Sequence, residues 1–348
     1  CAAFDNTVRD NSGDGMYIVA SFNDEEYLTE VTGNAVSANA GVGIYVQAGD
    51  EILLEGNVVT DNRGGGIEVK YHHHYTTIRQ NEVTGNTGSS FGGIYIEGPG
   101  IVEDNVIEYN TAANSAGGVN MVSSGAALRG NTIRFNSARR AGGVVAATRS
   151  TVIEDNWFEG NTATEDGGAV YVSSASYEMG LGIISNVFKG NEAARGGAVF
   201  LNGEARLEDN RFEENRAHVG GAAIYARSNT DMVDSDRSPV PLPDSLNTYS
   251  GNTPDDFSCY DLEFTGAVKH ADGSPLPGIE VRIQEIRAGG GEWIVMTDEN
   301  GVFQPEDWVT IDGRVIVTPI TPGYVYTPES RGVSAPWETP EFVATPQS

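Results

Sequence analysis

A small group of acidic, basic and histidine side chains stands out in a repetitive, glycine-rich sequence. Glu68, Lys70 and Glu97 lie on neighbouring short apolar stretches, and carboxylates brought about 5 Å apart on adjacent strands can act on a glycosidic bond or bind Ca²⁺. Three consecutive histidines follow Lys70, of which His72 and His74 face one way in an extended chain. Two imidazoles make a weak metal site without a third ligand. The same residues are also commonplace on an acidic surface.

Composition narrows the classes of partner. The chain has 348 residues, with 49 acidic and 21 basic side chains and a formal charge of −28. This excess would repel phosphates, so nucleic acid and anionic membranes are not expected partners. No apolar run approaches the roughly 20 residues of a membrane span. No phosphate loop, Ser-His-Asp or CxxC pattern is present, so we expect no cofactor, with Ca²⁺ as the one ion that the acidic surface would suit.

One six-residue motif recurs ten times. It begins and ends with Asn, and the second of the four residues between them is apolar. A pair repeated at this period marks one supersecondary unit stacked on copies of itself. The steps between copies range from 23 to 37 residues. The pairs are Asn6/Asn11, Asn34/Asn39, Asn57/Asn62, Asn81/Asn86, Asn105/Asn110, Asn131/Asn136, Asn156/Asn161, Asn186/Asn191, Asn210/Asn215 and Asn247/Asn252.

The segments between the Asn pairs predict the fold. Each unit holds two or three short strands with apolar residues at every second position, joined by Gly or Asn corners. One unit has too little apolar surface for a core, so units must stack in parallel, giving an all-β, parallel β-helix of about ten turns. We expect Asn to occupy left-handed corners and to form amide ladders along the stack, and Gly to supply positive φ.

Several repeats carry recognisable motifs. Phe158, Phe188 and Phe212 each begin an F-x-x-N segment that precedes a G-G-A or similar stretch. These segments resemble the F-x-x-N and G-G-A-I motifs of polymorphic outer-membrane-type passengers and of right-handed parallel β-helix repeat proteins. The resemblance covers about residues 1–258 and implies a β-helix of the kind used in adhesive or surface passengers. The same architecture also hosts pectin-type lyases and hydrolases.

A second domain follows a Pro-, Ser- and Asp-rich segment at 229–245, which we interpret as an inserted loop. The stretch D-G-S-P-L-P-G at 272–278 and the stretch T-D-E-N-G-V-F at 297–303 are strand–turn signals. They resemble the carboxypeptidase-regulatory-like (transthyretin-like) family, which implies a small antiparallel β-sandwich at 259–330 acting as a non-catalytic spacer or binding module. The tail 331–348 contains Pro336 and Pro340, and we expect a linker there.

An aromatic row runs along the strands that follow the glycines. Aligning these strands places Tyr17, Tyr45, Tyr95, Tyr171, Phe200 and Tyr225 at the outward position, with Glu68, Asn120 and Val145 at the remaining ones. Exposed rings spaced one per turn can stack on sugar faces and form a glycan-binding track. The plainer interpretation is that Tyr and Phe suit strands and cross-strand stacking.

The two cysteines and the first residue bear on localisation. Cys1 and Cys259 lie nine steps apart, roughly 43 Å at about 4.8 Å per step, so they should not pair with each other in one chain. Cys1 is a candidate for lipid modification or an intermolecular disulfide. The chain begins within a repeat and without Met, so we expect a piece of a longer exported protein.

These observations favour an extracellular or cell-surface structural or adhesive protein over an enzyme. Its expected partners are a surface glycan or another surface protein, and self-association remains open. One alternative is a polysaccharide lyase or hydrolase acting near Glu68, Lys70 and Glu97. Another is the subunit of a surface fibre or filament.

Overall fold

The structure is a computed structural model, and it divides into two compact units, Cys1–Cys259 and Tyr260–Ser348. The division lies one residue from the predicted boundary. The structure describes residues 1–19, 28–47, 51–70, 75–122, 125–147, 151–173, 181–203, 205–227, 247–253, 257–259, 265–285, 292–304, 315–333 and 340–347. The predicted loop at 229–245 and the candidate metal ligands His72 and His74 therefore lie outside the described residues.

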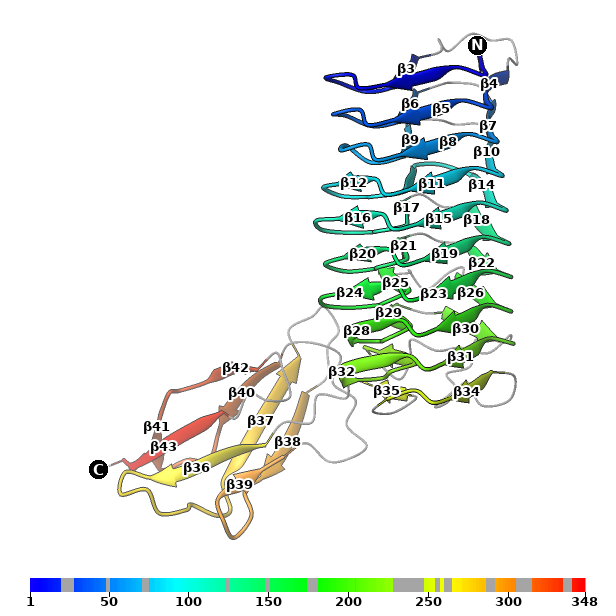
Figure 1. The fold of residues 1–348 in the computed structure, drawn as a ribbon. Helices are drawn as coiled ribbons and strands as arrows, with labels where there is room; N and C mark the ends of the chain where they lie inside the picture. The colour runs from blue at the N-terminus through cyan, green and yellow to red at the C-terminus, as the bar shows by residue number, and fades with distance from the viewer. Residues whose placement is uncertain are drawn as a thin grey trace. The chain divides into compact units, whose positions relative to one another are not determined.

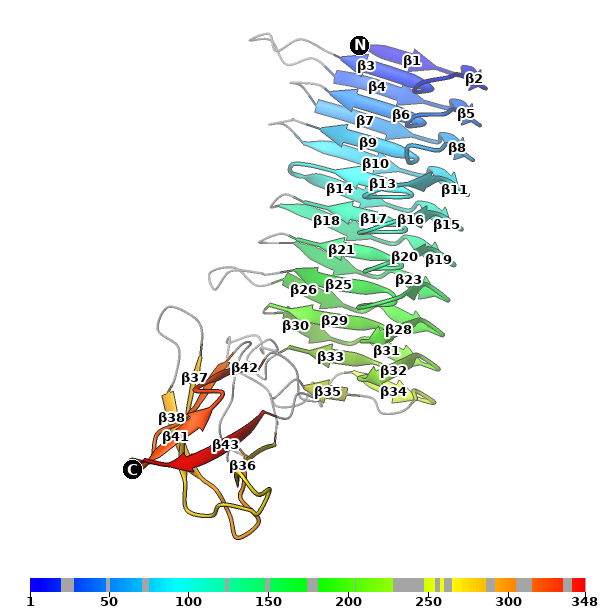
Figure 2. The same cartoon turned by 90° about the vertical axis from the view of Figure 1, so that its left-hand side faces the viewer.

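The first unit is a parallel β-helix, as predicted. Successive turns contribute strands to three parallel sheets, with nine described strands in the first sheet and ten in each of the others, and each strand pairs with its equivalent in the neighbouring turn (Figures 1 and 2). Because the repeat supplies the same short apolar strands each time, equivalent side chains of successive turns lie in register.

The described strands are as follows, in stacking order. The first sheet holds β1 (Ala2–Phe4), β4 (Leu28–Thr32), β7 (Glu51–Glu55), β10 (Thr76–Arg79), β14 (Gly100–Glu103), β18 (Ala126–Arg129), β22 (Val152–Glu154), β26 (Leu181–Ile184) and β30 (Ala205–Glu208). The second holds β2 (Thr7–Arg9), β5 (Ala35–Ser37), β8 (Val58–Thr60), β11 (Glu82–Thr84), β15 (Val106–Glu108), β19 (Thr132–Arg134), β23 (Trp157–Glu159), β27 (Val187–Lys189), β31 (Arg211–Glu213) and β34 (Thr248–Ser250). The third holds β3 (Met16–Val19), β6 (Ile44–Gln47), β9 (Ile67–Lys70), β13 (Ile94–Ile96), β17 (Val119–Met121), β21 (Val144–Ala146), β25 (Val170–Ser173), β29 (Val199–Asn202), β33 (Ile224–Ala226) and β35 (Phe257–Cys259).

A fourth sheet, which we call the ledge, was not predicted. Ile44 follows Asn39 by five positions, whereas Ile94 follows Asn86 by eight. The extra residues form short strands that stack on one another before the chain enters the third sheet. The ledge strands are β12 (Thr87–Gly88), β16 (Thr111–Ala112), β20 (Ser137–Ala138), β24 (Thr162–Ala163), β28 (Glu192–Arg195) and β32 (Arg216–Gly220).

The core of the β-helix is filled by rows of identical or similar side chains. In the second sheet one residue per strand points inward, and this row changes from Val59 and Val83 to Phe158, Phe188 and Phe212. The phenylalanine rings stack face to face with centroids 4.9 Å apart. The F-x-x-N motif therefore supplies core rings, whose burial and stacking both stabilise the fold.

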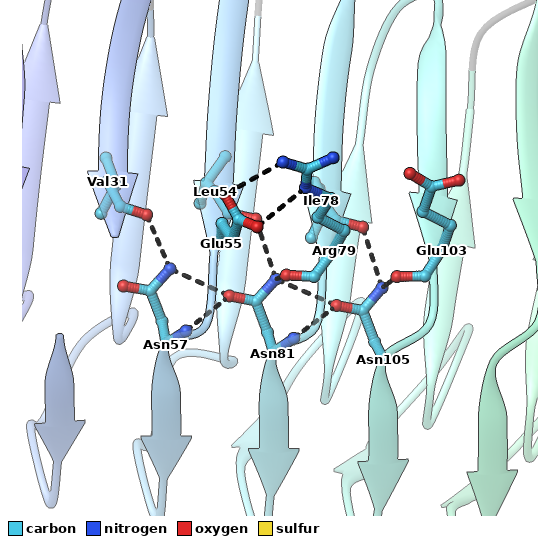
Figure 3. A network of polar contacts seen from close by, with 9 residues as sticks. All are labelled: Val31, Leu54, Glu55, Asn57, Ile78, Arg79, Asn81, Glu103 and Asn105. Atoms are coloured by element: carbon cyan, nitrogen blue, oxygen red, sulfur yellow. Dashed lines mark hydrogen bonds and ion pairs between the residues drawn. The ribbon is translucent and has the colours of Figure 1, made fainter. Parts of the chain in front are cut away.

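Two buried asparagine ladders hold the turns in register. The backbone N–H and the Nδ2 of Asn81 both donate to Oδ1 of Asn105, at 2.9 Å each (Figure 3). The same Nδ2 also donates to the carbonyl of Leu54 in the preceding turn, at 3.0 Å. One amide thus joins three turns, and the predicted ladders are confirmed at both corners of the second sheet, as the equivalent bond from Asn86 to Asn110 shows.

The predicted backbone role of Asn is wrong. The left-handed residue at each corner is the one before Asn, such as Gln80 (φ 55°) or Asp104 (φ 54°). This arrangement leaves the Asn side chain pointing inward, where its amide can reach both neighbouring turns.

The predicted role of Gly holds at only some positions. Gly117, which lies between ledge strand β16 and third-sheet strand β17, is not left-handed. A Cβ at this position would lie 2.4 Å from the carbonyl oxygen of Gly142. Glycine is required at that position because two backbones approach closely.

The second unit consists of two four-stranded sheets. One holds β39 (Val302–Phe303), β36 (Gly266–His270), β43 (Glu341–Pro346) and β41 (Tyr324–Thr327), and the other holds β38 (Glu292–Met296), β37 (Glu280–Glu285), β40 (Val315–Pro319) and β42 (Arg331–Val333). The pairs are antiparallel as predicted, except that β36 and β43 run parallel.

The predicted linker at 331–348 is wrong in its described part. β43 is a central strand, and its Phe342 and Ala344 are fully buried. The alternating apolar residues favour a strand more strongly than the nearby prolines oppose it. Pro340 lacks an N–H, but its carbonyl still accepts a hydrogen bond from the N–H of Ala267.

Hydrogen bonds join the two turn motifs of this unit, at 272–278 and 297–303. The hydroxyl of Thr297 donates to the carbonyl of Leu276 at 2.8 Å and accepts from the N–H of Ile279 at 2.9 Å. The Asp298 carboxylate accepts the N–H groups of Asn300 and Val302, each at 2.8 Å. These bonds, chiefly the one from Val302, lower the pKa of Asp298 below its usual value.

Replacing Asn105 by Ala should destabilise the β-helix by at least about 3 kcal/mol, because buried donors and acceptors in two neighbouring turns lose their partners. Asn6→Ala is the matched control, since Asn6 is exposed and only its contact with Asn34 is lost. That variant should lose less than about 1 kcal/mol. Urea unfolding followed by circular dichroism measures both, and equal losses would contradict the ladder's role.

Asp298→Asn should lower the thermal midpoint of the second unit at neutral pH but not in acid. A lowered folded-state pKa stabilises the fold above the ordinary value of 3.8, and this stabilisation disappears as the pH falls through the folded-state pKa. Thermal unfolding at pH 6 and below pH 3.8 tests the difference. Glu299→Gln in the same turn is the control, and a gap that persists in strong acid would refute the explanation.

Candidate functional site

The outward row of the third sheet has the register that the sequence predicts. Tyr17, Tyr45, Glu68, Tyr95, Asn120, Val145, Tyr171, Phe200 and Tyr225 pair in that order across successive strands. The expectation that all its rings are exposed is wrong for half of them. Tyr171, Phe200 and Tyr225 are only 8%, 4% and 6% exposed.

The ledge explains why these rings are buried. Arg195 comes from ledge strand β28, and its guanidinium lies 5.3 Å from the ring centre of Phe200 and 5.7 Å from that of Tyr225. Asp166 holds this guanidinium through two bonds of 2.7 and 3.1 Å. Burial raises the pKa of Asp166, against the opposing effect of Arg195. The three rings therefore form a packed layer beneath cations and are not a surface for sugars.

The remaining rings of the row stay accessible. Tyr17 is 63% exposed and stacks on Tyr45 with centroids 4.7 Å apart. Tyr95 is half-buried, and Phe91 at the start of the ledge packs against it at 5.5 Å. Any glycan contact on this face must therefore involve the part of the row from Tyr17 to Tyr95.

Polar side chains surround Tyr95. Lys70 forms a 2.6 Å ion pair with Glu68 on the same strand, and its ammonium lies 5.5 Å from the Tyr95 ring centre. The Glu68 carboxylate is largely buried, at 8% exposure. The hydrogen bond to Glu68 raises the pKa of Lys70, despite partial desolvation. Lys70 is thus held as a cation between a carboxylate and an aromatic ring.

Asn120 lies on the other side of Tyr95. It is 5% exposed, and its Nδ2 makes only a long, 3.4 Å contact with the carbonyl of Ser90. Its Oδ1 is buried without a hydrogen-bond partner among the described residues. A buried acceptor in this state can accept a hydrogen bond from an ordered water molecule.

Glu68 and Glu97 do not face each other in the strand register. The residue opposite Glu68 is Tyr95, and Glu97 lies two positions beyond it, where its N–H donates to the carbonyl of Val69. The cluster is therefore Glu68, Lys70, Tyr95 and Asn120. Among the described residues no group of three or more His, Cys, Asp or Glu side chains is placed to hold a metal ion.

The model of the right-handed β-helix region family matches residues 2–83, 21–181 and 73–236. The chain belongs to the right-handed β-helix family. No curated protein and no solved structure gives a match. The family match extends over most of the first unit and none of the second. It identifies the fold and does not specify an activity.

Sequence reasoning missed two surface features of this β-helix. The first is a groove of about 690 Å³ on the ledge, lined in part by Thr111, Ser137 and Thr162. The second is the pair Tyr109 and Phe135, which are 55% and 41% exposed at the corner after the second sheet. Both left a signal in the sequence. For the groove, the signal is the longer spacing after the second Asn of a pair. For the two rings, it is an aromatic residue where the other repeats carry Gly, Asp, Ala or Glu.

Among the described residues there is no helix that is long and apolar enough to cross a membrane. Cys1 is exposed and unpaired.

Phe200→Ala should destabilise the β-helix by about 3–5 kcal/mol, because the ring is buried between Tyr171, Tyr225 and Arg195. Tyr17→Ala, in the same row but exposed, should cost less than about 1 kcal/mol. Urea unfolding of the two variants compares these losses. A small loss for Phe200→Ala would show that the ledge does not cover this row.

Proposed function

We propose that this protein is an extracellular or cell-surface structural protein, a β-helical rod that adheres to glycans through the third-sheet face around Tyr95. The observation that carries the proposal is the partly exposed Tyr95 ring, with the ammonium of the Glu68–Lys70 ion pair 5.5 Å from its centre. A ring offers a surface for the C–H faces of sugars, and an ammonium beside it can donate to their hydroxyl groups.

The structural part of the proposal rests on the uniformity of the repeats. The Asn amides are the most numerous buried polar side chains, and all of them except Asn120 serve the ladders. Polar groups committed to neighbouring turns provide rigidity and are not available for catalysis. Acidic side chains over the rest of the surface favour solubility outside the cell.

The enzymatic alternative has less support. A lyase needs a base that is deprotonated near neutral pH, but the pKa of Lys70 is raised by its bond to Glu68. Glu68 is itself engaged in that bond, and Glu97 is not the residue opposite it. The carboxylate pair on which the enzymatic interpretation depended is therefore not assembled by the strand register.

For the second unit we propose a carboxypeptidase-regulatory-like spacer or binding module. In support, the two motifs that carry the resemblance form interlocked turns through Thr297 and Asp298. Such turns stabilise a β-sandwich without creating a cleft for chemistry.

Tyr95→Ala and Asn120→Ala should each weaken retention of the protein on immobilised glycans at least tenfold, because the first removes the contacting ring and the second removes the buried amide that lies beside it. Tyr75→Ala, an exposed ring outside the row (47% exposed), is the control and should bind like wild type. Glycan-array binding of folded variants measures this. Unchanged binding by both variants would refute the site.

A degradation screen with the same glycans separates adhesion from catalysis. We expect no cleavage products from the wild type. Cleavage that Glu68→Gln or Glu97→Gln abolishes would establish the enzymatic alternative instead.

A further inference from the structure

We propose that Tyr109 and Phe135 form a second binding platform, for a neutral saccharide, at the corner after the second sheet. This site is separate from the third-sheet face around Tyr95 and rests on different observations. The two rings stack with centroids 5.2 Å apart and planes 18° from parallel, and both are exposed. They come from adjacent turns, directly after β15 and β19.

The backbone at both residues is in an unfavourable conformation. Tyr109 has φ 56° and Phe135 has φ 55°, a left-handed geometry that is a genuine outlier for bulky side chains. At the same corner the neighbouring turns carry Gly85, Gly160 and Gly190, which adopt this geometry freely. Two exposed rings gain little from burial here, so folding alone does not account for them.

The neighbouring glycines make room for the rings. A Cβ at Gly160 would lie 2.7 Å from the Phe135 ring, so only glycine lets the ring lie over that turn. On the other side, Gly85 adds no side chain at the corner preceding Tyr109. The pair therefore has the backbone of the Gly160 turn beside Phe135 and the backbone of the Gly85 turn beside Tyr109.

Polar groups border the rings on both sides. Asp61 Oδ1 lies 2.7 Å from the place that a Cβ of Gly85 would occupy, so its carboxylate overhangs the turn next to Tyr109. Arg134 forms an ion pair with Glu108, and its guanidinium lies 5.9 Å from the Phe135 ring centre. A ligand on the rings thus meets hydrogen-bond acceptors at one end and a fixed guanidinium at the other.

This chemistry selects a neutral saccharide. Flat rings bind the C–H faces of sugars, while carboxylates and a guanidinium bind their hydroxyl groups. A polyanionic glycan would meet Asp61, Glu108 and a net charge of −28, and the positive charge of Arg134 is already used by Glu108. An aromatic platform bordered by acids therefore favours an uncharged polymer.

The test is affinity electrophoresis of the whole protein through gels containing hydroxyethyl cellulose, laminarin or soluble starch, with polygalacturonate as the polyanion. We expect at least one neutral polymer to retard the wild type, and Tyr109→Gly to weaken that retardation at least tenfold. Glycine accepts the left-handed geometry, so the thermal midpoint of this variant should not fall. This result separates lost binding from unfolding. Phe135→Gly should behave in the same way.

Tyr75→Ala is the control, because it removes an exposed ring outside both proposed sites and should leave retardation by the platform's polymer unchanged. Tyr95→Ala distinguishes the two proposed sites. If retardation is lost in Tyr95→Ala but kept in Tyr109→Gly, the platform is refuted and the third-sheet site is supported. Retardation by polygalacturonate alone, or by no polymer, also overturns the platform.

Discussion

The hydrogen bond between asparagine amides of successive turns is the interaction on which the rest of the β-helix depends. Each inner amide receives a bond from the turn before, donates to the amide of the turn after, and donates to a backbone carbonyl behind it. Two such ladders border the second sheet. A residue gained or lost between the two Asn of a pair would misalign both ladders, so this segment keeps one length in all ten turns.

Variation is therefore confined to the remaining parts of each turn, and these parts create the surface chemistry. The ledge begins at β12, in the turn that carries Phe91 and Tyr95. Before that turn the third-sheet face is open, and further on it is covered by Arg195 and Asp166. The polar cluster around Tyr95 lies where the open face meets the covered one. The side chains differ from turn to turn here while the backbone does not.

The sequence was sufficient for the fold class and for the register of the third sheet, because a constant Asn spacing leaves one way to align the turns. It was not sufficient for exposure. Tyr171, Phe200 and Tyr225 alternate like surface residues, and the segments that bury them are short and rich in Gly and Ala, without an apolar period. The aligned row already placed Tyr95 opposite Glu68, and Glu97 lies two positions beyond it.

The corner residues and the C-terminal tail show a further limit of sequence reasoning. Asn is the usual non-glycine residue in left-handed geometry, yet here the preceding residue adopts it, because the Asn side chain is needed inside. In the tail, two prolines suggested a linker, whereas Phe342 and Ala344 complete a central strand. In both cases a tertiary requirement outweighs the local preference of the residue.

The ladders also give the β-helix a mechanical character. The backbone hydrogen bonds and both amide ladders all join one turn to the next, so they point along the stacking direction. Tension along that direction is shared between sheet bonds and ladder bonds at each interface. Several bonds must therefore break before one turn separates from the next, so the load at each interface is carried by the whole turn.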